Sequence, residues 1–173
     1  LLDLARIEAG IDSQQELCSV ELIVDEVVAA FSEPAESKGI ELEVEPVEGL
    51  PAICVNRLRM TQAIGNLVSN AVKFSPQGGH VRLAVRREGD SIVLSVSDNG
   101  PGIAPVDQGR LFEKFVRVGG PEARAVEGTG LGLAIVRSVV ESQDGQVWME
   151  SQPGKGSTFF IRLPFGGTTP TGA

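Results

Sequence analysis

The sequence predicts a domain of the α/β (α+β) class, because amphipathic helical patterns and paired strand patterns both occur along its 173 residues. The clearest helical pattern covers residues 57–74, where apolar side chains recur at steps of four and three residues, at Met60, Ile64, Leu67, Ala71 and Phe74. Strand patterns come in two pairs, 81–87 with 91–97 and 146–151 with 157–163. We therefore expect one core-facing helix and two strand pairs, the first most simply a hairpin.

Two helical patterns separated by polar residues open the chain. Residues 1–9 are helix formers, and Gly10 is placed to end that helix. Residues 11–16 are polar and are interpreted as a linker, and residues 17–20 fit a short strand. Residues 21–37 carry apolar side chains at helical spacing with charges between them, which predicts an amphipathic helix.

Two further strands and a buried helix complete the pattern. Residues 40–44 alternate apolar with acidic side chains, which is typical of a strand with one solvent-facing side, and residues 51–55 fit another short strand. Asn56 suits the N-cap of the helix that follows. An apolar helix is expected after Gly132, and the small polar residues 166–173 are typical of a disordered tail.

The composition excludes several classes of function. A formal net charge of −8 argues against a nucleic-acid partner, because the general electrostatic attraction to phosphates would become repulsion. No apolar run approaches membrane-spanning length and no signal peptide is seen, so we expect a cytoplasmic domain. Cys18 and Cys54 lack the spacing of metal ligands and are interpreted as reduced core cysteines.

Two glycine clusters enclose a long variable segment. Residues 98–102 read Asp-Asn-Gly-Pro-Gly after a predicted strand, and residues 128–132 read Gly-Thr-Gly-Leu-Gly before a predicted helix. Glycine allows close approach of a ligand, and a helix start presents free N–H groups that suit a phosphate. Each cluster alone is compatible with a simple turn, but their order and separation together favour a nucleotide site. The segment between them, residues 103–127, contains several glycines and prolines and should be a mobile lid without nucleotide.

A polar stripe lies beside the apolar stripe of the central helix. Asn66, Asn70 and Lys73 are spaced by four and three residues, so they share one helical face at the border of the core. Two asparagines inside a helix are unfavourable for helix propensity, and buried amides need partners. Because carboxamide oxygens are hard ligands, this stripe favours a cavity that holds Mg²⁺ with phosphates.

At these motifs the chain resembles the sensor histidine kinases of bacterial two-component systems. Residues 66–75 (NLVSNAVKFS) resemble the N box of that family, and residues 98–103 (DNGPGI) its G1 box. Residues 111–117 (LFEKFVR) resemble the F box, residues 128–132 the G2 box, and residues 154–159 (GKGSTF) the last glycine-containing motif. The motifs occur in the family order.

The resemblance implies a fold, a reaction and partners. The fold is a two-layer α/β sandwich of the Bergerat type, with a mixed sheet covered on one face by helices. The implied cofactors are ATP and Mg²⁺, and the γ-phosphoryl group goes to a histidine on a separate dimerisation domain and then to a response-regulator aspartate. The parent would be a homodimer, with a membrane anchor compatible with the family, and the fragment a monomer. Residues 1–10 resemble the end of the dimerisation helix, residues 11–165 would form the ATP-binding domain, and the absence of an initial methionine suggests a piece of a longer protein.

The resemblance also implies site residues. Asn70 would ligate Mg²⁺, Asp98 would accept a hydrogen bond from the adenine amino group, and Thr158 and Gly102 would line the base pocket. Asn66, Lys73 and Arg117 would take part in catalysis near the phosphates. The full implied nucleotide site consists of Asn66, Asn70, Lys73, Phe74, Asp98, Gly100, Gly102, Ile103, Gly128, Thr129, Gly130, Leu131, Gly132 and Thr158.

Three features of the sequence depart from the family pattern. Phe74 stands where relatives often have tyrosine, so a contact through that hydroxyl is lost. Asp144 and Gly145 follow Gln143 where relatives commonly show His-Gly-Gly, so this turn is a point of difference. The phosphoacceptor motif is missing, and the only histidine, His80, is interpreted as a surface loop residue.

Two other readings of the motifs remain open at this point. One is an anti-sigma-type switch of the same ATPase superfamily, which sequesters a transcription factor and phosphorylates serine. The other is an ATP-driven clamp of the gyrase or chaperone type, which needs a transducer domain for which this sequence has no room.

Overall fold

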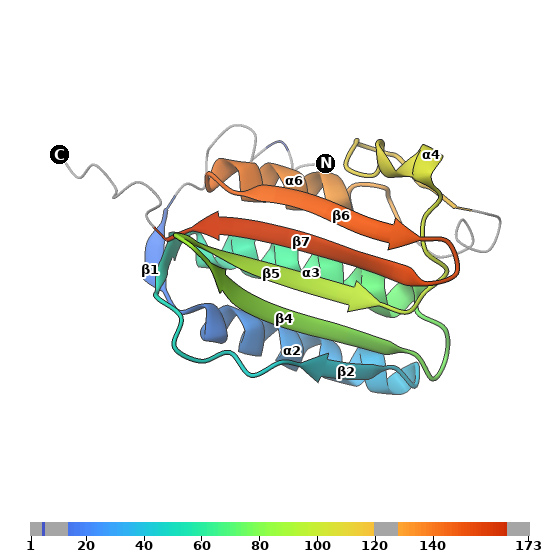
Figure 1. Ribbon diagram of the computed structural model, residues 1–173, viewed down its shortest axis with the longest axis horizontal. Coiled ribbons are helices and arrows are strands. Elements are labelled where there is room, and N and C mark those ends of the chain that lie inside the picture. The colour runs from blue at the N-terminus through green and yellow to red at the C-terminus, as the bar shows by residue number, and fades with distance from the viewer. Residues whose placement is uncertain (1–4, 6–13, 120–127, 166–173) are drawn as a thin grey trace.

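The computed structural model describes residue 5 and residues 14–119 and 128–165. Figure 1 shows one twisted sheet with three longer helices packed along a single face. The expected dimerisation helix at residues 1–10, apart from residue 5, and the expected tail at residues 166–173 lie outside the described residues, as do residues 120–127 of the expected lid. The proposed domain bounds therefore stay predictions.

Eleven elements are described, and after β1 each pair of consecutive strands follows a helix. The helices are α2 (Val20–Ser37), α3 (Arg57–Phe74), α4 (Pro105–Gln108) and α6 (Gly132–Ser142). The strands are β1 (Glu16–Cys18), β2 (Glu41–Val44), β3 (Ile53–Val55), β4 (His80–Glu88), β5 (Ser91–Asp98), β6 (Gln146–Gln152) and β7 (Gly156–Pro164).

The main sheet is mixed and has five strands in the order β2-β4-β5-β7-β6. Strand β2 runs parallel to β4, and every other neighbouring pair is antiparallel. Strands β4 and β5 form the predicted hairpin, with Glu88 opposite Ser91 beside the turn. A separate short sheet pairs β1 with β3. The expected two-layer α/β sandwich is confirmed, with helices on one face of a mixed sheet.

Helix α3 lies at the centre of the helical layer and packs against both α2 and α6. Its apolar stripe is buried as predicted from Met60 to Ala71, but Phe74 at the end of the helix keeps 36% of its surface exposed. The Asn56 side chain accepts from the Arg59 N–H at 3.0 Å, which confirms the expected N-cap. At the other end, the Lys38 ammonium donates to the carbonyl oxygens of Val72, at 2.7 Å, and Lys73. Both ends of α3 are therefore fixed by side chains.

The start of α2 differs from the expectation. The predicted strand at residues 17–20 ends at Cys18, because Ser19 becomes an N-cap and accepts a hydrogen bond from the Leu22 N–H at 3.3 Å. Both cysteines are free thiols, as expected, and only Cys18 is fully buried. Cys54 lies opposite Leu17, so the two cysteines are one position out of register on adjacent strands and point to opposite faces.

The outer face of the sheet carries a small aromatic pair. Trp148 on β6 stacks on Phe160 of β7 with ring centroids 5.0 Å apart and planes 7° apart. The Arg162 guanidinium lies over the tryptophan ring at 5.4 Å. Along β7, Phe160 and Arg162 alternate with Phe159 and Ile161, which are buried beneath the helices.

The turn after α6 explains the departure at residues 144 and 145. Asp144 adopts a positive φ of 57°, and the Gly145 N–H donates to the Val140 carbonyl at 3.0 Å, which closes the helix. An aspartate thus occupies a left-handed position that usually favours glycine. A Cβ at Gly145 would lie 2.6 Å from the Arg162 carbonyl oxygen, so that position does require glycine.

Replacing Asp144 with glycine should raise the free energy of unfolding by about 0.5–1 kcal/mol. Glycine removes the cost of a left-handed non-glycine residue from the folded state. The greater entropy of glycine in the unfolded chain offsets only part of this gain. Denaturant melts measure the change. The matched control Ser138→Gly, inside α6 with ordinary helical geometry, should lower stability instead. A loss of stability in Asp144→Gly would contradict the strain argument.

Candidate functional site

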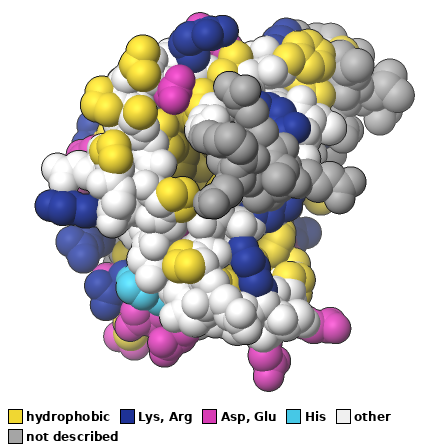
Figure 2. Space-filling view, turned by 90° about the vertical axis from the view of Figure 1, so that its right-hand side faces the viewer, with side chains coloured by type: hydrophobic (Ala, Val, Ile, Leu, Met, Phe, Trp, Pro, Cys, Tyr) yellow, Lys and Arg dark blue, Asp and Glu magenta, His cyan; other side chains and the backbone are white. Residues whose placement is uncertain are grey.

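Two adjoining cavities lie at the end of the sheet where β5 leaves it, beside the C-terminal half of α3. Their volumes are about 600 Å³ and about 400 Å³. Figure 2 shows this end of the molecule, with hydrophobic side chains bordering a hollow. Both cavities share the wall residues Asn70, Phe74, Leu111, Val118 and Leu133. One extended ligand could therefore occupy both.

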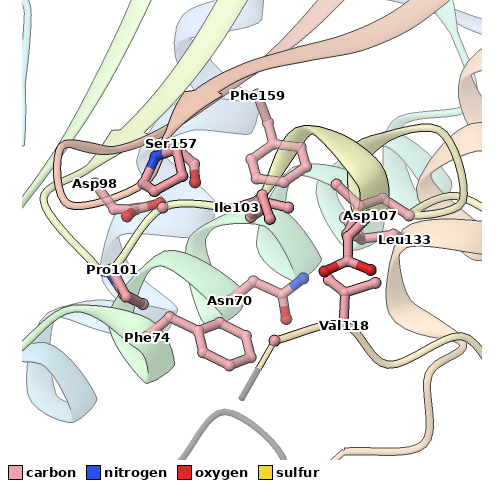
Figure 3. Close-up of a pocket in the computed structure, with 15 residues that line it drawn as sticks. Asn70, Phe74, Asp98, Pro101, Ile103, Asp107, Val118, Leu133, Ser157 and Phe159 are labelled. Carbon is pink, nitrogen blue, oxygen red and sulfur yellow. The ribbon is translucent and has the colours of Figure 1, made fainter.

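The larger cavity is apolar, with a carboxyl group at one side. Asp98, the last residue of β5, projects into it opposite Phe74 and Ile103 (Figure 3). Its Oδ1 accepts from the Gly100 N–H at 2.8 Å, and the Ser157 backbone N–H also donates to the carboxyl group. Burial raises the pKa of Asp98, and these two hydrogen bonds lower it less than burial raises it. An apolar slot with one buried acceptor suits a flat heterocycle that carries an amino group.

Two glycines are needed for the chain to close around Asp98. Gly102 has a φ of 72°, and a Cβ there would lie 2.0 Å from the Gln152 carbonyl oxygen. Gly156 has a φ of 87°, and its Cβ would lie 1.9 Å from the carbonyl oxygen of Asp98 itself. Neither position can take a side chain without moving the backbone that presents the carboxyl group.

The smaller cavity is polar and is lined by both the N-box stripe and the second glycine cluster. Asn66, Asn70 and Lys73 reach it from α3, and residues 128–132 line it just before α6. The Asn66 Nδ2 donates to the Gly132 carbonyl at 3.3 Å, which ties α3 to the start of α6. Helix α6 begins at Gly132, so its free N–H groups and the positive end of its dipole face this cavity. Arg117 also lines it.

The structure brings together almost every site residue predicted from the sequence. Gly100 is buried below the cavities, and its N–H supports Asp98 without lining either wall. Thr158 lies on the outer face of the sheet, where its hydroxyl pairs with that of Ser97 at 2.9 Å. The wall position expected for Thr158 is occupied by Ser157, because successive strand residues point to opposite faces.

Sequence reasoning missed much of the apolar wall and one acidic residue. Leu111, Val118, Leu133 and Phe159 close the larger cavity, together with Asp107 from α4. The apolar members follow no local pattern, because they come from segments that meet only in the folded chain. Asp107 lies inside the expected lid, where an acidic residue gave no signal.

The first part of the expected lid is anchored to the sheet. The Ile103 N–H donates to the Ser151 hydroxyl at 2.8 Å. The Gln108 side-chain amide donates to the carbonyl oxygens of Ile103, at 2.9 Å, and Ser151, at 3.2 Å. These bonds hold α4 against β6 and fix the rim of the larger cavity, so α4 belongs to the wall of the site.

Residues 55–167 match the family described as histidine kinase-, DNA gyrase B-, and HSP90-like ATPase, and this match takes in more than half of the chain. The chain belongs to this family. Its members are ATPases, as the cavity pair and the glycine clusters led us to expect.

Several relatives are sensor kinases. The chain is 39% identical over 166 residues to the sensor-like histidine kinase SenX3 of Mycobacterium tuberculosis, covering 95% of this chain and 40% of that protein. It is 36% identical over 166 residues to the alginate biosynthesis sensor protein KinB of Pseudomonas aeruginosa, covering 95% of this chain and 27% of that protein. Full-length ShkA, solved in complex with AMPPNP, matches with a TM-score of 0.82 at 32% identity, over 97% of this chain and 35% of that one.

These matches confirm the resemblance drawn from the five motifs: this ATPase domain is homologous to sensor histidine kinases. The chain spans no more than 40% of the length of these relatives. The activities and partners of the whole proteins are therefore separate questions from the family of the domain.

Acidification should weaken the preference for ATP over GTP at a pH above the ordinary aspartate range of about 4. An ionised carboxylate is a stronger acceptor for the adenine amino group than a protonated carboxyl group, and burial raises the pKa of Asp98, so this acceptor should weaken early as the pH falls. Competition binding at several pH values gives the ratio of the ATP affinity to the GTP affinity. Because both nucleotides carry the same triphosphate, protonation of the phosphates affects both affinities alike and cancels in this ratio. Asp98→Asn should show a low ratio at every pH. An unchanged wild-type ratio down to about pH 4 would contradict the assignment.

Proposed function

We propose that this chain is the ATP-binding catalytic domain of a sensor histidine kinase, which transfers the γ-phosphoryl group of Mg-ATP to a histidine on a separate dimerisation domain. One observation carries the proposal. An apolar slot with a buried carboxyl acceptor continues, past Asn70, into a polar cavity with a helix N-terminus and cationic side chains. That sequence of environments complements a base, a sugar and a phosphate chain in order.

The residues present fit Mg²⁺ through neutral oxygen. Asn70 lines both cavities, so its side-chain oxygen can reach a cation held by phosphates in the smaller one. Within residues 14–119 and 128–165, no group of three His, Cys, Asp or Glu side chains is arranged to hold a metal ion. The nucleotide itself would therefore supply much of the coordination. The ion would neutralise phosphate charge, which an acidic domain needs.

The chain's own groups would bind and orient the nucleotide. Asp98 would accept from the adenine amino group, with Ser157 supporting the carboxylate through its backbone N–H. Lys73 and Arg117 would place positive charge beside the phosphates, and residues 128–132 would donate backbone N–H groups. This is positioning and charge stabilisation, which account for most of the catalysis in phosphoryl transfer.

The partners and the cellular location extend the same proposal. The phosphoacceptor would belong to the dimerisation domain of the same or a paired protein, and the phosphoryl group would pass on to a response regulator. Among the helices that the structure describes, none has the length and apolarity needed to cross a bilayer. We place the domain in the cytoplasm, as part of a homodimeric parent.

Asn70→Ala should weaken Mg-dependent ATP binding by at least about tenfold. Loss of a residue that only supports a metal ligand already lowers metal affinity by about that factor, so loss of a direct ligand should cost no less. Alanine keeps or improves helix propensity at this position, so α3 should stay folded. Titration with a fluorescent ATP analogue, with and without Mg²⁺, measures the effect. Leu58→Ala, at an exposed position of the same helix that lines neither cavity, provides the control. Equal affinities for Mg-ATP in a folded Asn70→Ala variant would remove Asn70 from the site.

The chain alone should stay unlabelled when it is given γ-labelled Mg-ATP. Its only histidine, His80, is exposed at the start of β4, and its backbone N–H donates to Asn99 Oδ1 at 2.9 Å. In-line transfer needs the nucleophile within about 3–3.5 Å of the reacting phosphorus. Addition of the parent's dimerisation domain should restore labelling, slowly because the tether is gone.

The chemical stability of the label distinguishes this function from serine phosphorylation. Phosphohistidine is acid-labile and phosphoserine is not, so label on the dimerisation domain should be lost in acid. Stoichiometric labelling of the isolated chain that disappears in His80→Gln would overturn the proposed division between ATP-holding and phosphoacceptor domains.

A further inference from the structure

Asp107 is a second acidic side chain in the wall of the larger cavity, in addition to Asp98, and the proposed roles leave it unused. It belongs to α4, is half-buried, and lines the larger cavity. Figure 3 shows Asp98 and Asp107 on opposite sides of this cavity, with the Asp107 carboxylate beside Val118 and Leu133. If Asp98 binds the base, Asp107 faces a different part of the nucleotide.

Asp107 shares the wall of the larger cavity with residues that also line the smaller one, which puts it towards the junction between the two cavities. Its neighbours in Figure 3, Val118 and Leu133, line both cavities, and so does Leu111, four residues further along the chain. Asp107 itself lines only the larger one. A nucleotide that spans both cavities has its ribose at this junction, because the sugar connects the base to the phosphates.

The carboxylate is held in place by its backbone and has no partner among the described residues. The Asp107 N–H donates to the Ala104 carbonyl at 2.9 Å, and its own carbonyl accepts from Arg110 at 3.2 Å. The side chain of Arg110 pairs instead with Glu113, at 3.4 Å. No described cation neutralises Asp107, although Lys73 and Arg117 line the neighbouring cavity.

The chemistry of a carboxylate selects which group can lie against it. Phosphate oxygens would be repelled, and the adenine amino group is taken by Asp98 in the arrangement proposed above. Ribose offers two adjacent hydroxyl donors, and an ionised carboxylate is an acceptor with two oxygens. Hydrogen bonds to a charged group are stronger than neutral ones, so the pairing would discriminate between sugars.

We propose that Asp107 is a specificity-determining residue that accepts hydrogen bonds from the ribose hydroxyl groups of the nucleotide and makes the site select ribonucleotides over deoxyribonucleotides. The inference rests on the proposed function, because it takes ATP as the ligand. It assigns to α4 a recognition role that is separate from base and phosphate binding.

The experiment compares the affinities of ATP, 2′-deoxy-ATP and 3′-deoxy-ATP by calorimetry, for the whole chain and for Asp107→Ala. The wild type should prefer ATP over at least one deoxy form by about tenfold or more, as the loss of a hydrogen bond to a charged group predicts. In Asp107→Ala the preference should fall to within about twofold, with deoxy-ATP bound as well as by the wild type. Asp107→Asn, which keeps the shape but not the charge, should fall between the two.

The control is Asp25→Ala, which removes an exposed carboxylate from α2 and should leave the sugar preference unchanged. ATP binding without sugar preference in the wild type, or a preference that persists in folded Asp107→Ala, would overturn this inference and leave the proposed function standing. If the wild type binds none of the three nucleotides, both proposals fail together.

Discussion

The burial of one face of α3 against the sheet determines the geometry of the site. The apolar stripe of this helix, with Met60, Ile64 and Leu67 essentially inaccessible, fixes its rotation about its own axis. Asn66, Asn70 and Lys73 each precede an apolar stripe residue by one position, so they are rotated by about 100° and emerge at the border of the core. Core packing and the placement of the amide groups are therefore one constraint. A change that rotated α3 to improve its packing would also turn Asn70 away from both cavities.

A second constraint comes from the pairing of β5 with β7, which sets the surroundings of Asp98. Their register places Asp98 opposite Ser157, whose backbone N–H donates to the carboxyl group. The close approach at Gly156 allows this pairing to continue to the end of the sheet. The Asp98 carboxyl group is thus held by backbone N–H groups of Gly100 and Ser157, which lie far apart in the sequence.

Sequence patterns predicted the helices and strands well where a long periodic segment or a clear turn signal was present. The bounds of α3, including its N-cap, followed from an uninterrupted stripe, and the β4–β5 hairpin followed from a short glycine-containing turn. The start of α2 was misplaced, because a capping serine outweighed the strand pattern of its neighbours. In the site, motif matching placed Thr158 in the cavity although strand alternation puts Ser157 there. Asp107 could not be foreseen, since only tertiary contacts bring α4 to the cavity.

The aromatic pair on the outer face of the sheet has a practical consequence for optical measurements. Trp148 is the only tryptophan of the chain, and it stacks on Phe160 on the side of the sheet opposite the helices and the cavities. Its fluorescence therefore depends on the integrity of the β6–β7 pair and on the guanidinium group above the ring. Intrinsic emission should report the unfolding of this domain and respond little to ligand contacts, because the indole and the two cavities lie on opposite sides of the sheet.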